Sequence, residues 1–100
     1  MKTQTTRKMN VEVEVPVTVD TDDRGIAEYL GKHIIVFCVN YIYSGILAGV
    51  NNTNILIKDG GIVYETGAFT DSKFKDFQPI GHDIRINLAA IESFGPTNKR

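Results

Sequence analysis

Hydrophobic and polar residues alternate strictly near the N-terminus of the chain. Residues 11–19, with the sequence VEVEVPVTV, place valine at every odd position and Glu, Pro or Thr at every even position. This period of two predicts a half-buried β-strand. Because proline cannot donate to a β-ladder and the glutamates oppose edge-to-edge association, we expect this strand at the edge of a sheet. Residues 1–10 are polar and lack an apolar period, so we expect them to form a flexible arm.

The next segment, residues 20–31, predicts one short helix. Its acidic residues can cap the N-terminus and occupy the first turn. Ile26, Tyr29 and Leu30 then form an apolar face with i, i+3 and i+4 spacing. Gly31 is expected to end the helix, because glycine readily adopts the left-handed conformation that follows many helices.

Two strongly apolar segments follow, separated by a turn at Asn40 and Tyr41. Residues 33–39, HIIVFCV, are apolar on both faces. They predict a strand that is covered on one side by the barrel interior and on the other by the helix or a neighbouring subunit. Residues 41–50, YIYSGILAGV, predict a second strand that bends sharply enough to serve two sides of a small barrel. Bulges in an open sheet are the alternative interpretation. The bend is expected at the small residues Gly45, Ala48 and Gly49.

The rest of the chain predicts three further strands. Residues 54–69 indicate two of them, joined by a tight turn at the Asp-Gly-Gly of residues 59–61, because Asp-Gly pairs adopt hairpin turns readily. A long loop over residues 70–83 then precedes the last strand, residues 84–94.

Together these elements predict a mainly β protein. We expect a small, strongly bent, five-stranded antiparallel barrel of the SH3 or OB kind, with one short N-terminal helix and an extra N-terminal edge strand. The predicted domain spans residues 11–96, between the flexible arm and a tail of residues 97–100. A chain of 100 residues removes roughly two-thirds of its unfolded surface from water on folding, so oligomerisation would be a natural way to bury more.

Composition and charge narrow the classes of function. Eleven basic and twelve acidic side chains give a formal net charge of −1, so the field of the whole molecule attracts neither nucleic acid nor an anionic membrane. Any such binding requires a local patch. The single cysteine, Cys38, excludes an intramolecular disulfide, and no segment predicts a signal peptide or a membrane span. We therefore expect a cytoplasmic protein without membrane association.

Candidate chemistry is sparse. His33, Cys38 and the pair His82-Asp83 lack a recognised ligand spacing, so we expect no metal, no cofactor and no enzymatic activity. The 70–83 loop interleaves cations with aromatic residues, a mix that suits single-stranded nucleic acid. A loop of this length more often carries an aromatic anchor that packs on its own barrel or on the next subunit, and we favour that interpretation. The residues concerned are Lys73, Phe74, Lys75 and Phe77.

The segment from residue 31 to residue 57, GKHIIVFCVNYIYSGILAGVNNTNILI, resembles the Sm and Lsm proteins. Their first motif has a Gly-Lys entry to strand one, a bent glycine-bearing strand two, a polar turn and an apolar strand three. Its spacing here is similar to that of the bacterial Hfq branch. Leu88 and Ile91 match the second motif, and the resemblance covers residues 20–94. The residues that match the first motif are Gly31, Lys32, Gly45, Leu47, Leu56 and Ile57.

The resemblance implies a homo-oligomeric ring of five to seven subunits around a pore, in which the fourth strand of one subunit pairs with the fifth strand of the next. It also implies that two turns lining the pore bind single-stranded RNA. Asparagine amides suit this role, because each offers a donor and an acceptor to a base edge without adding charge. The candidate RNA-binding residues are Asn51, Asn52, Thr53, Asn54, Arg85 and Asn87.

Three departures from the family pattern support an alternative. Asn51 stands where the family has aspartate, and Thr53 has no π-face at a position where a stacking residue is usual. Arg85 is followed by Ile86 instead of glycine. The alternative is a ring-forming structural or assembly protein, for example a divergent phage-borne relative, that has lost the RNA pocket. A monomeric SH3- or OB-like binding module is the third hypothesis.

Overall fold

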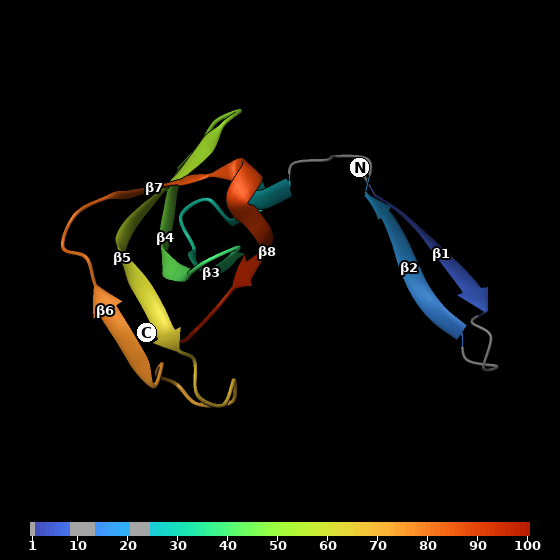
Figure 1. The fold of residues 1–100 in the computed structure, drawn as a ribbon. Coiled ribbons are helices and arrows are strands. Elements are labelled where there is room, and N and C mark those ends of the chain that lie inside the picture. The colour runs from blue at the N-terminus through green and yellow to red at the C-terminus, as the bar shows by residue number, and fades with distance from the viewer. Residues whose placement is uncertain (1, 9–13, 21–24) are drawn as a thin grey trace.

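The computed structural model describes residues 2–8, 14–20 and 25–100, and the side chains of the last of these ranges. The protein is mainly β (Figure 1). A two-stranded sheet contains β1 (Lys2–Lys8) and β2 (Glu14–Asp20). A six-stranded sheet contains β3 (His33–Cys38), β4 (Ile42–Val50), β5 (Asn54–Glu65), β6 (Asp76–Pro79), β7 (Ile84–Asn87) and β8 (Ile91–Pro96). The two short 3-10 helices are η1 (Gly25–Tyr29) and η2 (Leu88–Ala90).

The six-stranded sheet is organised around one long strand, β5. The strand order is β6-β5-β4-β3-β8, and β7 pairs with β5 outside this path. Residues 61–65 of β5 pair with β6, and residues 54–57 pair with β7, both antiparallel. The strands curl around a common interior (Figure 1). Over residues 25–100 no ladder joins β8 to β6 or β7, so the observed architecture is a curved sheet of six antiparallel strands.

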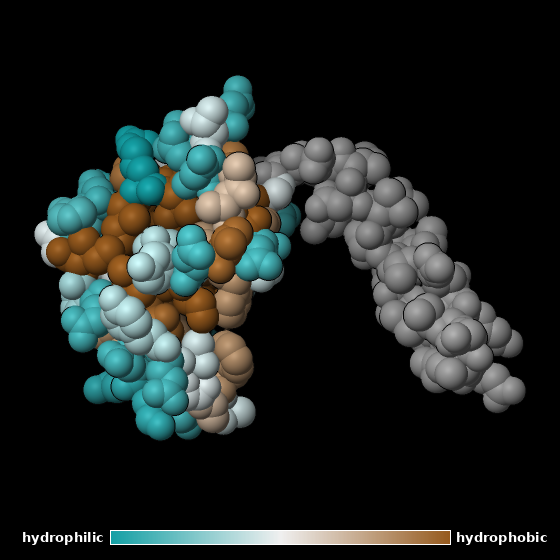
Figure 2. All heavy atoms as spheres, viewed as in Figure 1, coloured by the Kyte–Doolittle hydropathy of each residue, from teal (hydrophilic) through white to brown (hydrophobic). Residues whose placement is uncertain are grey.

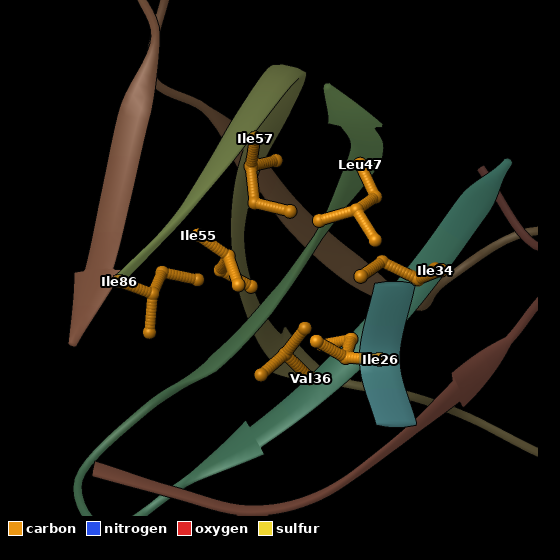
Figure 3. Packing of buried hydrophobic residues seen from close by; sticks show 7 residues of the cluster. All are labelled: Ile26, Ile34, Val36, Leu47, Ile55, Ile57 and Ile86. Atoms are coloured by element: carbon orange, nitrogen blue, oxygen red, sulfur yellow. The ribbon is translucent and has the colours of Figure 1, made fainter. Parts of the chain in front are cut away.

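The core lies inside this curl. Seven buried side chains from η1, β3, β4, β5 and β7 point toward one another (Figure 3). A second buried cluster lies on the other face of β3, where Ile35 packs with Val63 and Phe74. Successive residues of β3 thus contact different clusters, so this strand is covered on both sides. The second face is covered by Val63 and Phe74 and not by the helix, because Ile26 of η1 belongs to the first cluster. The first cluster contains Ile26, Ile34, Val36, Leu47, Ile55, Ile57 and Ile86.

Several large hydrophobic side chains also reach the surface. On the face that Figure 2 shows, hydrophobic side chains lie among hydrophilic ones. Isolated exposed residues of this kind are ordinary in folded domains. Val39 and Tyr41, however, are close neighbours in the connection between β3 and β4. The exposed set is Leu30, Val39, Tyr41, Tyr64, Phe69 and Phe94.

The small residues of residues 41–50 lie at irregularities in the pairing of β4. The register between β4 and β5 shifts twice, on either side of Gly45 and on either side of Ala48. The extra residue of the first shift lies in β5, opposite Gly45, and that of the second is Ala48 in β4. Bulges of this kind increase the local twist of the paired strands. Gly45 also permits a close approach, since a Cβ at this position would lie 2.8 Å from the Cα of Gly60. The small residues thus coincide with register shifts, as the alternative interpretation of bulges in a sheet expects, and no observed pairing over residues 25–100 closes a barrel.

The tight turn predicted at residues 59–61 is wrong. β5 runs without interruption from Asn54 to Glu65. Asp59 adopts a positive φ of 52°, and it forms part of the bulge opposite Gly45 instead of a hairpin. The following glycine lies against β4, where a Cβ on Gly60 would come within 2.5 Å of the carbonyl oxygen of Ser44. Contact with the neighbouring strand, which short-range sequence does not encode, keeps the chain extended here.

Three other predicted elements differ from the structure. The strand predicted over residues 84–94 is divided into β7 and β8 by η2. The 70–83 loop contains β6, so the predicted count of five strands is wrong. The helix predicted over residues 20–31 is observed only as the five-residue 3-10 helix η1. Its predicted first residue, Asp20, belongs to β2, and residues 21–24 lie outside the described residues. Gly31 follows η1 with a φ of 83°, as expected.

The N-terminal segment contains a strand that we did not expect. Residues 2–8, predicted as part of a flexible arm, form β1 and pair antiparallel with β2 in a separate sheet. Threonine is favourable in strands and recurs through β1, which explains how a polar segment can pair in this way. The strand predicted over residues 11–19 is observed as β2, although residues 11–13 lie outside the described residues.

The C-terminal tail is packed against the domain. Lys99 has only 3% of its surface exposed, and its Nζ donates to the carbonyl oxygens of Ala68 and Asp71 at 2.5 and 3.1 Å. The backbone N–H of Phe74 donates to the carbonyl oxygen of Arg100 at 3.2 Å. The tail of residues 97–100 therefore belongs to the packed structure, because lysine and backbone groups there bind the 66–75 connection.

Candidate nucleic-acid interface

The connection between β4 and β5 is held by the side chain of Asn51. Its Oδ1 accepts hydrogen bonds from the backbone N–H groups of Thr53 and Asn54, both at 2.8 Å, and from Thr53 Oγ1 at 3.1 Å. The backbone N–H of Asn51 in turn donates to the carbonyl oxygen of Asn54 at 3.0 Å. Asparagine is suited to this role because its short side chain mimics a backbone turn. The sequence of the connection thus fixes its own conformation.

β7 brings Arg85 and Asn87 to this connection. In the ladder between β5 and β7, Asn54 lies opposite Asn87. Arg85 Nη1 donates to Asn54 Oδ1 at 2.9 Å, and Asn54 Nδ2 donates to Thr53 Oγ1 at 3.0 Å. Residues that are 31 positions apart in the chain, Asn54 and Arg85, therefore share one hydrogen-bonded network.

The end of β7 is joined to the same network through its backbone. Leu88 donates its N–H to the carbonyl oxygen of Thr53 at 2.9 Å. Asn87 Oδ1 accepts from the backbone N–H of Ala89 at 3.1 Å and so caps η2. Five of the six candidate residues thus form one cluster, which we call the amide cluster: Asn51, Thr53, Asn54, Arg85 and Asn87. Asn52, the sixth, is exposed at the tip of the connection and takes no part in these bonds.

The amide cluster presents mainly donors to the solvent. The side-chain oxygens of Asn51, Asn54 and Asn87 already accept hydrogen bonds inside the protein. The donors that remain are the amide nitrogens of Asn51 and Asn87, the second N–H of Asn54 Nδ2 and the other N–H groups of Arg85. Against these donors stands one free lone pair each on the side-chain oxygens of Asn54 and Asn87. Within residues 25–100, Arg85 forms no ion pair. Donors and one positive charge suit a ligand rich in acceptors, such as phosphate or base carbonyl oxygens.

A cavity that sequence reasoning missed lies beside the amide cluster. It has a volume of about 160 Å³, and Arg85 and Asn87 form part of its wall. The lining also includes Tyr41 and Tyr43, whose ring centroids lie 6.2 Å apart with the planes at 59°. The i, i+2 spacing of two tyrosines on one predicted strand could have indicated that they share a face. Its complete lining is Cys38, Val39, Asn40, Tyr41, Tyr43, Arg85, Ile86, Asn87 and Ala90.

Two groups that line this cavity, Tyr43 and Cys38, have raised pKa values. Burial, with smaller contributions from Cys38 and Tyr41, raises the pKa of Tyr43. Burial and the nearby carboxylate of Glu92 raise the pKa of Cys38. Because a protonated thiol is a poor nucleophile, these shifts suit a binding surface better than a catalytic one.

The aromatic residues of the 70–83 loop have a structural role. Phe74 is 8% exposed and packs with Ile35 and Val63. Its ring stacks on Phe77 with the centroids 5.8 Å apart. The preferred interpretation of an aromatic anchor on the protein's own core is confirmed. Lys75 is exposed, and its Nζ lies 3.4 Å from Glu65 Oε1. This ion pair neutralises part of the positive charge of the loop.

Comparison with protein-family models, with curated proteins and with solved structures finds no match for this chain. The fold therefore defines a class only in general terms, as a mainly β protein with one curved sheet of six antiparallel strands. In the part of the chain that the structure describes, no helix has the length and hydrophobicity needed to cross a membrane.

Proposed function

We propose that this protein is an Sm-like subunit of a homo-oligomeric ring that binds single-stranded RNA. The hydrogen bond between Arg85 and Asn54 is the observation that supports this function best, because it joins the two predicted binding segments in one chain. The donors around that bond suit the acceptor-rich surface of a single strand.

The strand arrangement supports the ring. Among the described strands, β8 and β6 are the two ends of the strand order, and β6 covers the edge of residues 61–65, which belong to the predicted fourth strand. Each therefore has an outer edge with unpaired backbone groups, which a strand of an identical copy can satisfy. In a closed ring every subunit would use both edges, and the amide clusters would repeat around the axis.

The mass of the protein in solution tests the ring. We expect light scattering to give five to seven times the 11.1 kDa mass of one chain, independent of concentration in the micromolar range. A mass of one chain at all concentrations would contradict the ring and select the monomeric binding module.

RNA binding is tested by removing the charge of the amide cluster. We expect Arg85→Met to weaken binding of labelled oligo-uridine or oligo-adenine at least about tenfold, because hydrogen bonds to charged groups contribute ~1.5–3 kcal/mol. Fluorescence anisotropy at low salt measures the effect. Lys58→Met is the matched control, since Lys58 is an exposed cation on β5 outside the cluster. Equal losses in the two variants would show that only general charge matters, and no saturable binding by the unmodified protein would remove the RNA function.

One observation favours the alternative, a ring-forming structural or assembly protein. Five of the six candidate side chains already make hydrogen bonds within the protein. A purely structural role, in which these bonds fix the turn against β7, is sufficient to explain them. A ring mass together with no binding of either oligonucleotide would select this alternative.

A further inference from the structure

We propose that the cavity between the β3–β4 connection and β7 is a nucleobase subsite, in which one base stacks on Tyr41 while Arg85 contacts the adjoining phosphate. This inference rests on the proposed RNA function and deepens it, because it adds an aromatic contact that the amide cluster lacks. The cavity and the cluster share Arg85 and Asn87, so a strand that leaves one enters the other.

The size of the cavity fits a single flat ring system. Its volume of about 160 Å³ lies below the ~300–1,000 Å³ that is usual for drug-sized ligands. Its floor is apolar, since Ile86 is 4% exposed and belongs to the main core. A planar base with an apolar face and polar edges is complementary to a site of this kind.

The position of Tyr41 is fixed while its side chain remains accessible. The backbone N–H of Cys38 donates to the carbonyl oxygen of Tyr41 at 2.9 Å, and that of Val39 donates to Ala90 at 3.2 Å. These bonds hold the connection against η2. Tyr41 is nevertheless 49% exposed, and it meets Tyr43 at 59° instead of in a parallel stack. A preordered aromatic ring of this kind contributes ~1–3 kcal/mol to binding of a stacked base.

The charge of the cavity wall favours a nucleotide over a peptide side chain. Arg85 supplies a positive charge, and Asn87 supplies an amide nitrogen because its oxygen is engaged by Ala89. An apolar peptide side chain could fill the apolar part of the cavity but would offer no acceptor to the N–H groups of Arg85 that Asn54 does not engage. A nucleotide provides both a stacking base and a phosphate, so it satisfies both parts of the cavity.

Substitutions of Tyr41 test the subsite in the full-length protein. We expect Tyr41→Leu to weaken anisotropy-detected binding of labelled oligo-uridine and oligo-adenine about tenfold, whereas Tyr41→Phe, which keeps the ring, changes it less than about twofold. Tyr64→Leu is the matched control, since Tyr64 is 58% exposed but does not line this cavity. The subsite is overturned if Tyr41→Leu binds as the unmodified protein does, or if Tyr41→Phe loses as much as Tyr41→Leu.

A second measurement separates this inference from the proposed function. Millimolar uridine or adenosine monophosphate should shift the ring NMR signals of Tyr41 and leave those of Tyr64 unchanged. If oligonucleotide binding depends on Arg85 but not on Tyr41, the RNA function stands and the subsite fails. If monophosphates shift Tyr41 but no oligonucleotide binds, the subsite stands and the RNA function fails. If neither kind of probe binds, both fail, and a protein partner becomes the better occupant of the cavity.

Discussion

Replacing Gly45 or Gly60 with alanine is expected to lower the free energy of unfolding by about 3 kcal/mol or more, at the upper end of the range for overpacked interiors. A Cβ on Gly45 would lie 2.8 Å from the Cα of Gly60 and 2.9 Å from the carbonyl oxygen of Lys58. A Cβ on Gly60 would lie 2.5 Å from the carbonyl oxygen of Ser44. These neighbours are backbone atoms, which cannot rotate away as a side chain can. Either substitution must therefore separate β4 from β5 at the bulge.

Two other glycines provide controls for this result. At Gly49, also in β4, a Cβ would meet only ordinary van der Waals contact, with Leu56 Cβ at 3.5 Å. At Gly95 in β8 nothing lies within 4 Å. Alanine at either site is expected to be neutral or to stabilise the protein by ~0.4–1 kcal/mol through the unfolded state. Urea unfolding measures all four variants. If Gly45→Ala and Gly49→Ala had equal midpoints, the close approach of β4 and β5 would be contradicted.

Lys99→Met is expected to lower the free energy of unfolding by about 2 kcal/mol, because hydrogen bonds that involve a charged group contribute ~1.5–3 kcal/mol. The ammonium donates to two backbone carbonyl oxygens. The ammonium nitrogen also lies 5.6 Å from the ring centroid of Phe74 and 5.9 Å from that of Phe69. Cation–π attraction at these distances stabilises the folded protein further. Methionine keeps most of the volume of the lysine side chain but can make neither interaction.

The same connection offers a matched control, Lys73→Met. Lys73 is exposed, so its loss should change the free energy of unfolding by less than about 0.5 kcal/mol. Urea unfolding with both variants separates the buried ammonium from a general effect of charge. Equal free energies of unfolding for the two variants would contradict the prediction. They would mean that the cost of removing the Lys99 ammonium from water cancels the gain from its hydrogen bonds and cation–π contacts.

Much of the fold follows from periodicity and from small residues. The apolar run of residues 33–39 predicts β3, and the small residues of residues 41–50 coincide with the two register shifts between β4 and β5. The segment of residues 59–61 was misread because Asp-Gly suits both a hairpin and a bulge. The choice between them depends on how closely β4 approaches, and that contact joins residues far apart in the chain.

The candidate site was predictable to a similar extent. Asparagine in a polar turn predicts the bonds that Asn51 makes to its own connection. The bond between Asn54 and Arg85 depends on the register of β7 against β5, which no local pattern specifies. The burial of Lys99 was missed because lysine is rarely buried, and only the carbonyl groups of a distant connection make it favourable.

The pairing of β5 with β4, β6 and β7 has an evolutionary consequence. An insertion or deletion inside β5 would shift its register against three partners at once and exchange core-facing side chains for outward-facing ones. In the described part of the chain, the connection of residues 81–83 before β7 forms no backbone hydrogen bond to β5, whereas the N–H of Ile80 still donates to the carbonyl oxygen of Gly60 in β5. The two flanking strands, β6 and β7, pair with β5 independently. Divergence in chain length is therefore tolerated at that connection, whereas β5 can change only by substitution.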